Sequence, residues 1–314
     1  MSQDADSGLT AAERTRLDAI RGADALADLV AVTGAASEHD AYFAAKRQHR
    51  ELTARAGTPL SAADDLPGTR VVVDGTAFWV HGVTHADTPA ERDFLRRHVA
   101  QFLADDANVY VEQGIRPMYF DDVAGVCEMD DYAWATEQCA GLDSATHVDL
   151  PEAAFDGVVE DVNALAGRFR TAAFSLIDAG GQYYGEDFEA ALGDLATTFL
   201  TSHADAATGR DFASFQLSRN AARDPTLLDA LQSYYQRAFL PQPVEREWLR
   251  RHDPELEVVT HARNEHMADY AVYHHETAPA VHLVVGAAHQ PGVTYYLRQH
   301  RDGSRTVDGF ELAG

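Results

Sequence analysis

Two short segments of the chain share one pattern, a glycine followed three residues later by a histidine. Gly82-Val-Thr-His85 and Gly286-Ala-Ala-His289 each follow an apolar stretch and precede a proline that opens a helical stretch. Glycine at a strand end permits a tight turn and close backbone approach, and strand ends are where open α/β sheets bind ligands. The repeated context predicts that His85 and His289 face one another across a crevice, and it indicates an internal duplication.

Glu112 is the third candidate, because it ends another apolar stretch that begins at Asn108. A carboxylate beside buried valines is costly unless it has a partner. Two imidazoles and one carboxylate resemble a metal-ligand set that keeps open positions for water and substrate. The pattern therefore predicts His85, Glu112 and His289 as ligands of a divalent metal. The alternatives are a pair of hydrogen-bonded core histidines and a plain ion pair between Glu112 and an arginine.

Arg263 and Asn264 complete the candidate set, and we expect them in the first turn of a helix capped by Thr260. Arginine is a fixed, permanently charged fork that suits an oxyanion or a carboxylate, so Arg263 is predicted to stabilise developing charge. Asn264 is predicted to orient the substrate. Arg263 could equally be the structural partner of Glu112, and Asn264 could satisfy backbone groups at the start of the helix.

Periodicity and capping signals predict the elements that position these residues. We expect helices over residues 10–34, 37–56 and 89–104, several more between 151 and 250 (including 186–202 and 225–239), and others over 260–275 and after 290. We expect strands over residues 70–73, 76–80, 108–111 and 281–285, with a last strand over 306–312. The first two strands should form a hairpin around Asp74-Gly75.

These elements predict an α/β fold, in which a central mixed sheet comes from two duplicated strand–GxxH–helix halves. Residues 1–60 are predicted to form an N-terminal helical extension. Residues 61–314 are predicted to form the α/β domain, with a helical insertion over about 120–255. The N-terminal helices could form a cap over the site or a homodimer surface.

The candidate residues resemble the TraB/Tiki family, which includes the TraB/PrgY/GumN-like proteins and belongs with the erythromycin-esterase-like and ChaN-like proteins. Its pattern is a first Gly-x-x-His, a glutamate at a strand end, an arginine-containing helix with a methionine four residues on, and a second Gly-x-x-His before Pro-Gly. Here these are Gly82–His85, Glu112, Arg263–Met267 and Gly286–Gly292. The resemblance covers residues 70–113 and 260–300. Ala288 stands where the family often has another glycine.

The resemblance implies an α/β fold with duplicated halves, and its Tiki branch implies metal-dependent peptidase activity. The leading hypothesis is therefore a hydrolase acting on an amide or ester, with Mn, Co or Zn held by His85, Glu112 and His289, lowering the pKa of a water. A second hypothesis is a metal-free esterase in which one histidine is the general base. A third, implied by the TraB and ChaN relatives, is a non-catalytic protein that binds a peptide or haem.

Composition limits the partners and the compartment. The formal net charge is -25, and Lys46 is the only lysine among 25 basic residues. A strongly acidic, lysine-poor surface stays hydrated where salt screens its self-repulsion, which predicts a cytoplasmic protein from a salt-rich cytosol. The same charge disfavours nucleic acid. The two cysteines, Cys127 and Cys139, form no CxxC motif. No apolar stretch is long enough to predict a membrane span, so the expected partner is a peptide or small-molecule substrate.

Overall fold

The computed structural model describes residues 8–57, 65–86, 88–112, 126–129, 212–252, 257–275 and 278–307. It confirms the predicted hairpin. Strands β1 (Thr69–Val73) and β2 (Thr76–Val83) pair antiparallel. Asp74 and Gly75 connect them with positive φ angles of 48° and 91°, the left-handed pair that a two-residue turn of this kind requires. The second strand continues through Gly82 to Val83.

The sheet is mixed and five-stranded, with the order β1-β2-β5-β3-β4. Its other strands are β3 (Asn108–Glu112), β4 (Val126–Met129) and β5 (Ala280–Gly286), and β2, β5, β3 and β4 run parallel. The mixed α/β class is thus confirmed, while the descent of the two halves from a duplication stays a prediction. Strand β4, which contains Cys127, was not predicted because four residues carry little periodic signal.

Helices account for most of the remaining described residues. They are α1 (Ala11–Arg21), α2 (Leu26–Thr33), α3 (Glu38–Ala56), α4 (Pro89–Ala104), α10 (Phe212–Arg223), the 3₁₀ helix η1 (Pro225–Leu227), α11 (Leu228–Ala238), α12 (Gln242–His252), the π-helical turn η2 (Val258–Ala262), α14 (Arg263–His274) and α15 (Gln290–Arg301). Helix α4 begins as predicted, because Thr88 Oγ1 accepts from Glu91 N and Pro89 occupies the first turn. The stretch expected as one helix over 10–34 is two helices, α1 and α2.

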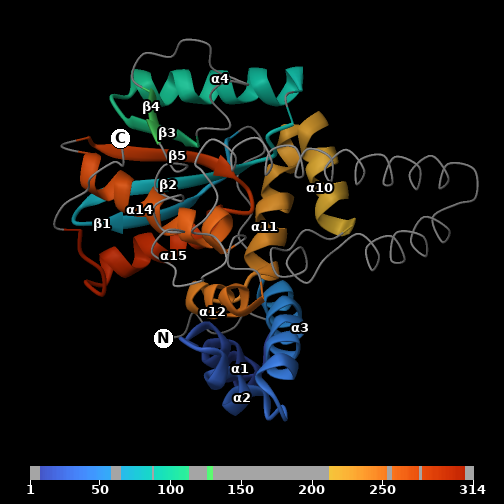
Figure 1. Cartoon of the computed structure of the whole chain (residues 1–314). Helices are drawn as coiled ribbons and strands as arrows, with labels where there is room; N and C mark the ends of the chain where they lie inside the picture. The colour runs from blue at the N-terminus through green and yellow to red at the C-terminus, as the bar shows by residue number, and fades with distance from the viewer. Residues whose placement is uncertain are drawn as a thin grey trace, which may run out of the picture.

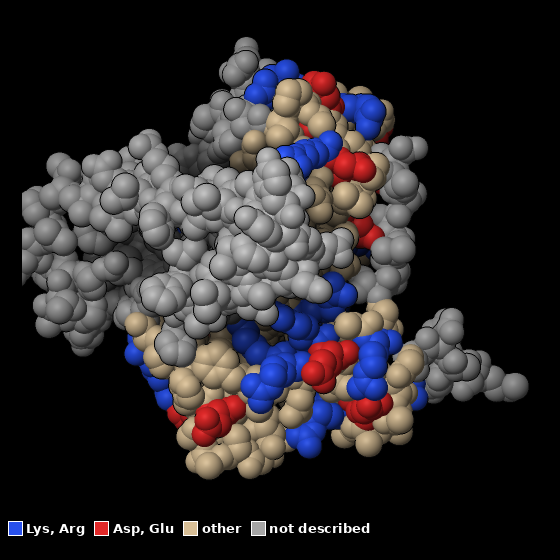
Figure 2. Space-filling model, turned by 90° about the vertical axis from the view of Figure 1, so that its right-hand side faces the viewer, with Lys and Arg blue, Asp and Glu red and all other residues tan. Residues whose placement is uncertain are grey.

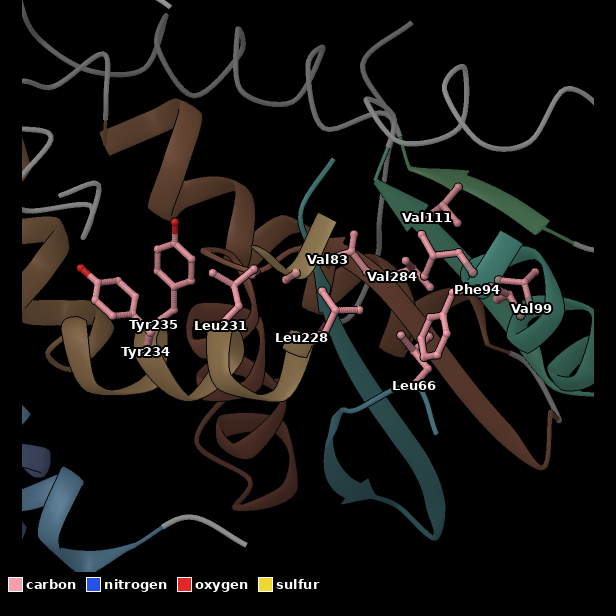
Figure 3. Packing of buried hydrophobic residues seen from close by; sticks show 14 of the residues in the cluster. Leu66, Val83, Phe94, Val99, Val111, Leu228, Leu231, Tyr234, Tyr235 and Val284 are labelled. Atoms are coloured by element: carbon pink, nitrogen blue, oxygen red, sulfur yellow. The ribbon is translucent and has the colours of Figure 1, made fainter. Parts of the chain in front are cut away.

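The two faces of the sheet are covered by different helices (Figure 1). Helix α4, with α10 and α11, packs on one face around Val83, Val111 and Val284, as Figure 3 shows at close range. Helices α14 and α15 pack on the other face around Leu283 and Val285. Consecutive residues of β5 therefore enter opposite cores, as the alternation of side chains along a strand requires. Because both faces are covered, the strand ends are where polar residues can gather.

The N-terminal helices share a hydrophobic cluster with α12 rather than with the sheet. Tyr42 of α3 stacks on Trp248 with ring centroids 4.1 Å apart. Its hydroxyl donates to Glu245 Oε2 at 2.7 Å, and Lys46 Nζ lies 3.3 Å from Glu245 Oε1. A buried carboxylate that keeps its charge needs such partners. These contacts join residues of the predicted N-terminal extension to residues of the predicted insertion, and the domain boundaries themselves stay predictions.

The start of helix α14 differs from the expectation, and most of the expected last strand lies outside the described residues. Thr260 does not cap a helix; it lies inside the π-helical turn Val258–Ala262, which runs directly into Arg263 of α14. Residues 306 and 307 are not in a strand, and the rest of the expected strand over 306–312 lies outside the described residues, as do residues 151–211 and Cys139. Among the helices that the structure describes, none combines the length and hydropathy needed to cross a membrane.

Candidate functional site

The candidate residues meet at the carboxyl ends of three adjacent parallel strands. β2 is paired with β5 so that Val83 lies opposite Gly286, and β3 is paired with β5 so that Val111 lies opposite Val284. Glu112, one residue further, therefore reaches the same edge of the sheet. Helix α14 brings Arg263 and Asn264 to this edge, because α14 and α15 pack on the same face. The predicted convergence of the two motifs is observed.

Glu112 is the centre of the site. Its Oε1 accepts from Arg263 Nη2 at 2.9 Å, and its Oε2 accepts from the backbone N–H of Gly286 at 2.8 Å. Burial alone would raise the pKa of this carboxyl, but the charges of His289, His85 and Arg263 and the Gly286 N–H outweigh it and lower the pKa to about 2. Glu112 therefore stays ionised at neutral pH, so it can attract a cation but is a weak general base.

The two motif histidines lie on either side of this carboxylate. His85 Nε2 is 3.5 Å from Glu112 Oε2, and His289 Nε2 is 3.6 Å from Glu112 Oε1. Both separations are longer than a hydrogen bond. His85 Nε2 is buried and has no hydrogen-bond partner among the described residues. The side chains of His85 and His289 are 27% and 15% exposed, so parts of both rings reach solvent although His85 Nε2 itself is buried.

A chain of amide hydrogen bonds orients His289. Its Nδ1 lies 2.8 Å from Asn264 Oδ1, and Asn264 Nδ2 donates to Gln242 Oε1 at 3.1 Å. Gln242 Oε1 also faces His261 Nδ1 at 3.1 Å. Because Asn264 presents its oxygen, the His289 proton sits on Nδ1 and a neutral ring carries its lone pair on Nε2. Asn264 is thus a positioning residue for His289, not a backbone cap.

The motif glycines make room for residues of the opposite motif. A Cβ on Gly82 would lie 2.8 Å from Ala287 Cα, and a Cβ on Gly286 would lie 3.1 Å from His85 Nε2. The residue that adopts the left-handed backbone is His85 itself, with φ 57°. A non-glycine residue in this region costs about 1–3 kcal/mol and often marks a functional site. The two glycines are therefore explained by the close approach of Ala287 and His85, not by a turn that only glycine can adopt.

Gly292 makes room for the Asn264 side chain in the same way. A Cβ at this position would lie 2.1 Å from Asn264 Nδ2 and 2.9 Å from Asn264 Cβ. The Pro-Gly after the second motif thus combines a proline in the first turn of α15 with an opening through which the Asn264 side chain passes. Gln242 and His261 were not predicted, because a glutamine or histidine in an unmarked helical stretch has no spacing that identifies it.

The donor set fits a divalent metal in part. Two ligands of a tetrahedral ion at about 2.1 Å lie roughly 3.4 Å apart, close to both histidine–glutamate separations of 3.5 and 3.6 Å. Without an ion or a proton between them, the Nε2 lone pair of neutral His289 would face a carboxylate oxygen. Within the described residues, however, no three His, Cys, Asp or Glu side chains are together placed to hold a metal. Each histidine–glutamate pair therefore has a separation that fits two ligands of one ion, whereas a complete set of three ligands would need side-chain movement.

The fold and the site define an α/β protein with a buried, ionised glutamate between two histidines and an arginine at the strand ends. Compared with protein-family models, with curated proteins and with solved structures, the chain matches none.

Proposed function

We propose that the protein is a hydrolase of amide or ester bonds, a peptidase, amidase or esterase, with its site at His85, Glu112, Arg263, Asn264 and His289. The observation that carries the proposal is the orientation of His289. Its Nδ1 faces Asn264 Oδ1 at 2.8 Å while its Nε2 faces the site. A neutral ring held in this tautomer directs its Nε2 lone pair into the site, where it can either take a proton from a water that attacks a carbonyl carbon or bind a metal ion.

The neighbouring side chains suit the rest of such a reaction. Arg263 lies against Glu112 with its side chain 23% exposed, so a guanidinium is present beside the position where negative charge develops on the substrate oxygen. Glu112 holds Arg263 and the Gly286 N–H in place. Gln242 keeps Asn264 from rotating. Groups that are already fixed in place need little reorganisation during the reaction.

A divalent ion is the cofactor that we favour, and His85, His289 and Glu112 would hold it once their side chains move into a complete ligand set. When bound, it would supply Lewis-acid polarisation of the carbonyl and would lower the pKa of a water. Support comes from the two Nε2 atoms that flank the carboxylate at 3.5 and 3.6 Å, and from Asn264, which holds the non-ligating nitrogen of His289 in the manner usual for metal-bound histidines.

A metal-free hydrolase is the second candidate, and the Arg263–Glu112 ion pair favours it. Arg263 already neutralises Glu112 across a 2.9 Å contact, which reduces the negative charge available to a metal. His289 would then take the proton from water unaided, the water oxygen would bond to the carbonyl carbon, and the proton would pass to the leaving nitrogen or oxygen as its bond to carbon breaks.

Metal content and turnover together separate the candidates. The protein, purified in molar KCl, is analysed by mass spectrometry beside H85A, H289A and the control H98A; His98 lies on α4 and its Nδ1 faces the Phe94 carbonyl. About one ion per wild-type and H98A chain, lost in both site variants, supports the metal site. All four proteins are then tested on nitrophenyl esters and a peptide mixture, with and without chelator.

Each outcome has a consequence. Turnover that survives chelation but is lost in H289A supports the metal-free hydrolase. Absence of turnover in wild type after incubation with Mn, Co and Zn contradicts the hydrolase proposal and leaves a binding protein. Turnover equal in all four proteins shows that the activity arises elsewhere.

A further inference from the structure

A cavity of about 670 Å³ lies between the N-terminal helices and the α/β part of the chain. Helices α1 and α3 contribute one wall, and β1, α11 and α15 contribute the others. Its lining includes none of His85, Glu112, Arg263 and His289, so it is separate from the candidate hydrolytic site. This volume is within the range of pockets that hold small organic molecules.

The charge around this cavity is opposite to that of the protein. Arg21, Arg70 and Arg298 line it, and Asp229 is the acidic residue in the lining. Among the described residues, none of the three arginines has an acidic side chain within ion-pair distance; Arg21 donates to Thr53 Oγ1 at 3.3 Å. The Arg70 guanidinium lies over the Trp79 ring, 6.0 Å from the ring centroid, whereas Arg21 is close enough for its charge to act on Arg298. The lining therefore brings two cations together in a chain of net charge -25.

Figure 2 views the molecule from the side where α11 and α3 lie, and shows Lys and Arg side chains with Asp and Glu side chains among them in the lower part of this face, which is where the N-terminal helices lie in Figure 1. Like charges held close together repel, and α15 places Arg298 so that Arg21 and Arg301 add to the burial that lowers its pKa. An anion between the guanidiniums would relieve this repulsion, and the planar fork of arginine suits phosphate and carboxylate groups.

The rest of the lining suits an organic ligand larger than a bare ion. Phe239 and Leu240 are buried and apolar, and Pro241, Pro291 and Tyr295 add further apolar surface. His49 is buried, and that burial lowers its pKa to about 4, so it is neutral at pH 7 and does not add to the positive charge. The cavity therefore combines a cationic part with an apolar part.

We propose that this cavity binds a small organic anion that carries at least two negative charges on phosphate or carboxylate groups, held by Arg21 and Arg298. Its position relates it to the hydrolytic site. Gln242 lines the cavity and accepts from Asn264, which in turn holds His289. A ligand that contacts Gln242 is connected to His289 through two hydrogen bonds, which is a suitable position for an effector of the hydrolytic site. The binding of such a ligand does not depend on the proposed hydrolysis.

The test is direct binding to the full chain by titration calorimetry, with ADP, pyrophosphate and citrate as probes at two KCl concentrations. We expect a Kd of about 1 mM or tighter for at least one probe, weakened at least tenfold in the double variant R21Q/R298Q. Preference for ADP and pyrophosphate identifies a phosphate ligand, and preference for citrate a carboxylate. R16Q is the matched control, because Arg16 is an exposed arginine on α1 outside the lining.

The proposal is overturned if no probe binds, or if R16Q weakens binding as much as R21Q/R298Q, which would indicate attraction to surface charge in general. Circular dichroism of R21Q/R298Q establishes that the variant is folded before its affinity is interpreted. Because the readout is heat of binding, a protein without hydrolytic activity can still pass this test, and an active hydrolase can fail it.

Discussion

Substituting Gly292 by alanine should destabilise the protein through one side chain, Asn264. The new Cβ would lie 2.1 Å from Asn264 Nδ2, 2.5 Å from its Cγ and 2.9 Å from its Cβ. Rotation of the amide alone cannot relieve a clash that extends to Cβ. The Asn264 side chain must therefore move, and its hydrogen bonds to His289 Nδ1 and Gln242 Oε1 are lost with it.

The expected cost follows from these terms. Overpacking of a buried position costs about 1–3 kcal/mol, and two lost hydrogen bonds cost about 1 kcal/mol each. Alanine has a higher helix propensity than glycine, which offsets about 1 kcal/mol of this loss in helix α15. The net loss in free energy of unfolding should be about 3 kcal/mol. Urea unfolding followed by circular dichroism at fixed KCl measures it, since urea leaves the ionic strength unchanged.

A double-mutant cycle tests the reason as well as the size. In an N264G background the clashing atoms are absent, so G292A should cost less than about 1 kcal/mol, or even stabilise the helix. If G292A costs under about 0.5 kcal/mol in the wild-type background, or costs the same in both backgrounds, the close packing of Asn264 on Gly292 is not what this glycine provides.

Three further perturbations address other parts of the structure. G286A places a Cβ 3.1 Å from His85 Nε2, so it should reduce metal content or turnover at least tenfold while leaving the unfolding midpoint close to wild type; an unchanged site would show that His85 can move at no cost. K46M leaves Glu245 buried without its cation and should lower the free energy of unfolding by about 3 kcal/mol, measured by the same urea titration; the double variant K46M/E245Q should recover part of this loss. Burial would raise the pKa of Asp269, but its hydrogen bonds and ion pairs with Arg305 and His300 outweigh the burial and lower this pKa. The ionised carboxylate therefore contributes to stability at neutral pH, and this contribution is lost as pH falls below the ordinary value of 3.8. D269N should therefore lose about 2 kcal/mol at pH 7 and much less at pH 3; a difference that does not change with pH would contradict this assignment.

The local elements that position the site were predictable because their signals are local. Asp74-Gly75 between two apolar stretches gave the hairpin, and Thr88-Pro89 gave the start of α4. The convergence of His85 and His289 followed from the repeated strand–glycine–histidine order, because parallel neighbours bring their carboxyl ends to one edge. Each of these inferences needs only a few adjacent residues and a rule about chain geometry.

The parts that sequence reasoning missed depend on contacts between distant segments. Gln242 holds Asn264 from a helix with no motif of its own, and nothing near residue 242 indicates that role. The close approach of Gly82 to Ala287 is likewise visible only once the two strands are paired. Thr260 has the residue type of a helix cap, but the chain before it already turns as a π-helix, so local propensity gave way to the packing of the segment.

The single lysine gives the chain a built-in chemical reporter. An amine-reactive ester has two kinds of target here, the α-amino group of the chain and Lys46, because every other basic side chain is arginine. Lys46 is only 13% exposed and is paired with Glu245, and its Nζ also lies 5.1 Å from the Tyr42 ring centroid. Acylation of Lys46 should therefore be slow while α3 packs on α12 and faster when they separate, so its rate relative to that of the α-amino group reports on the opening of this junction in the otherwise folded protein.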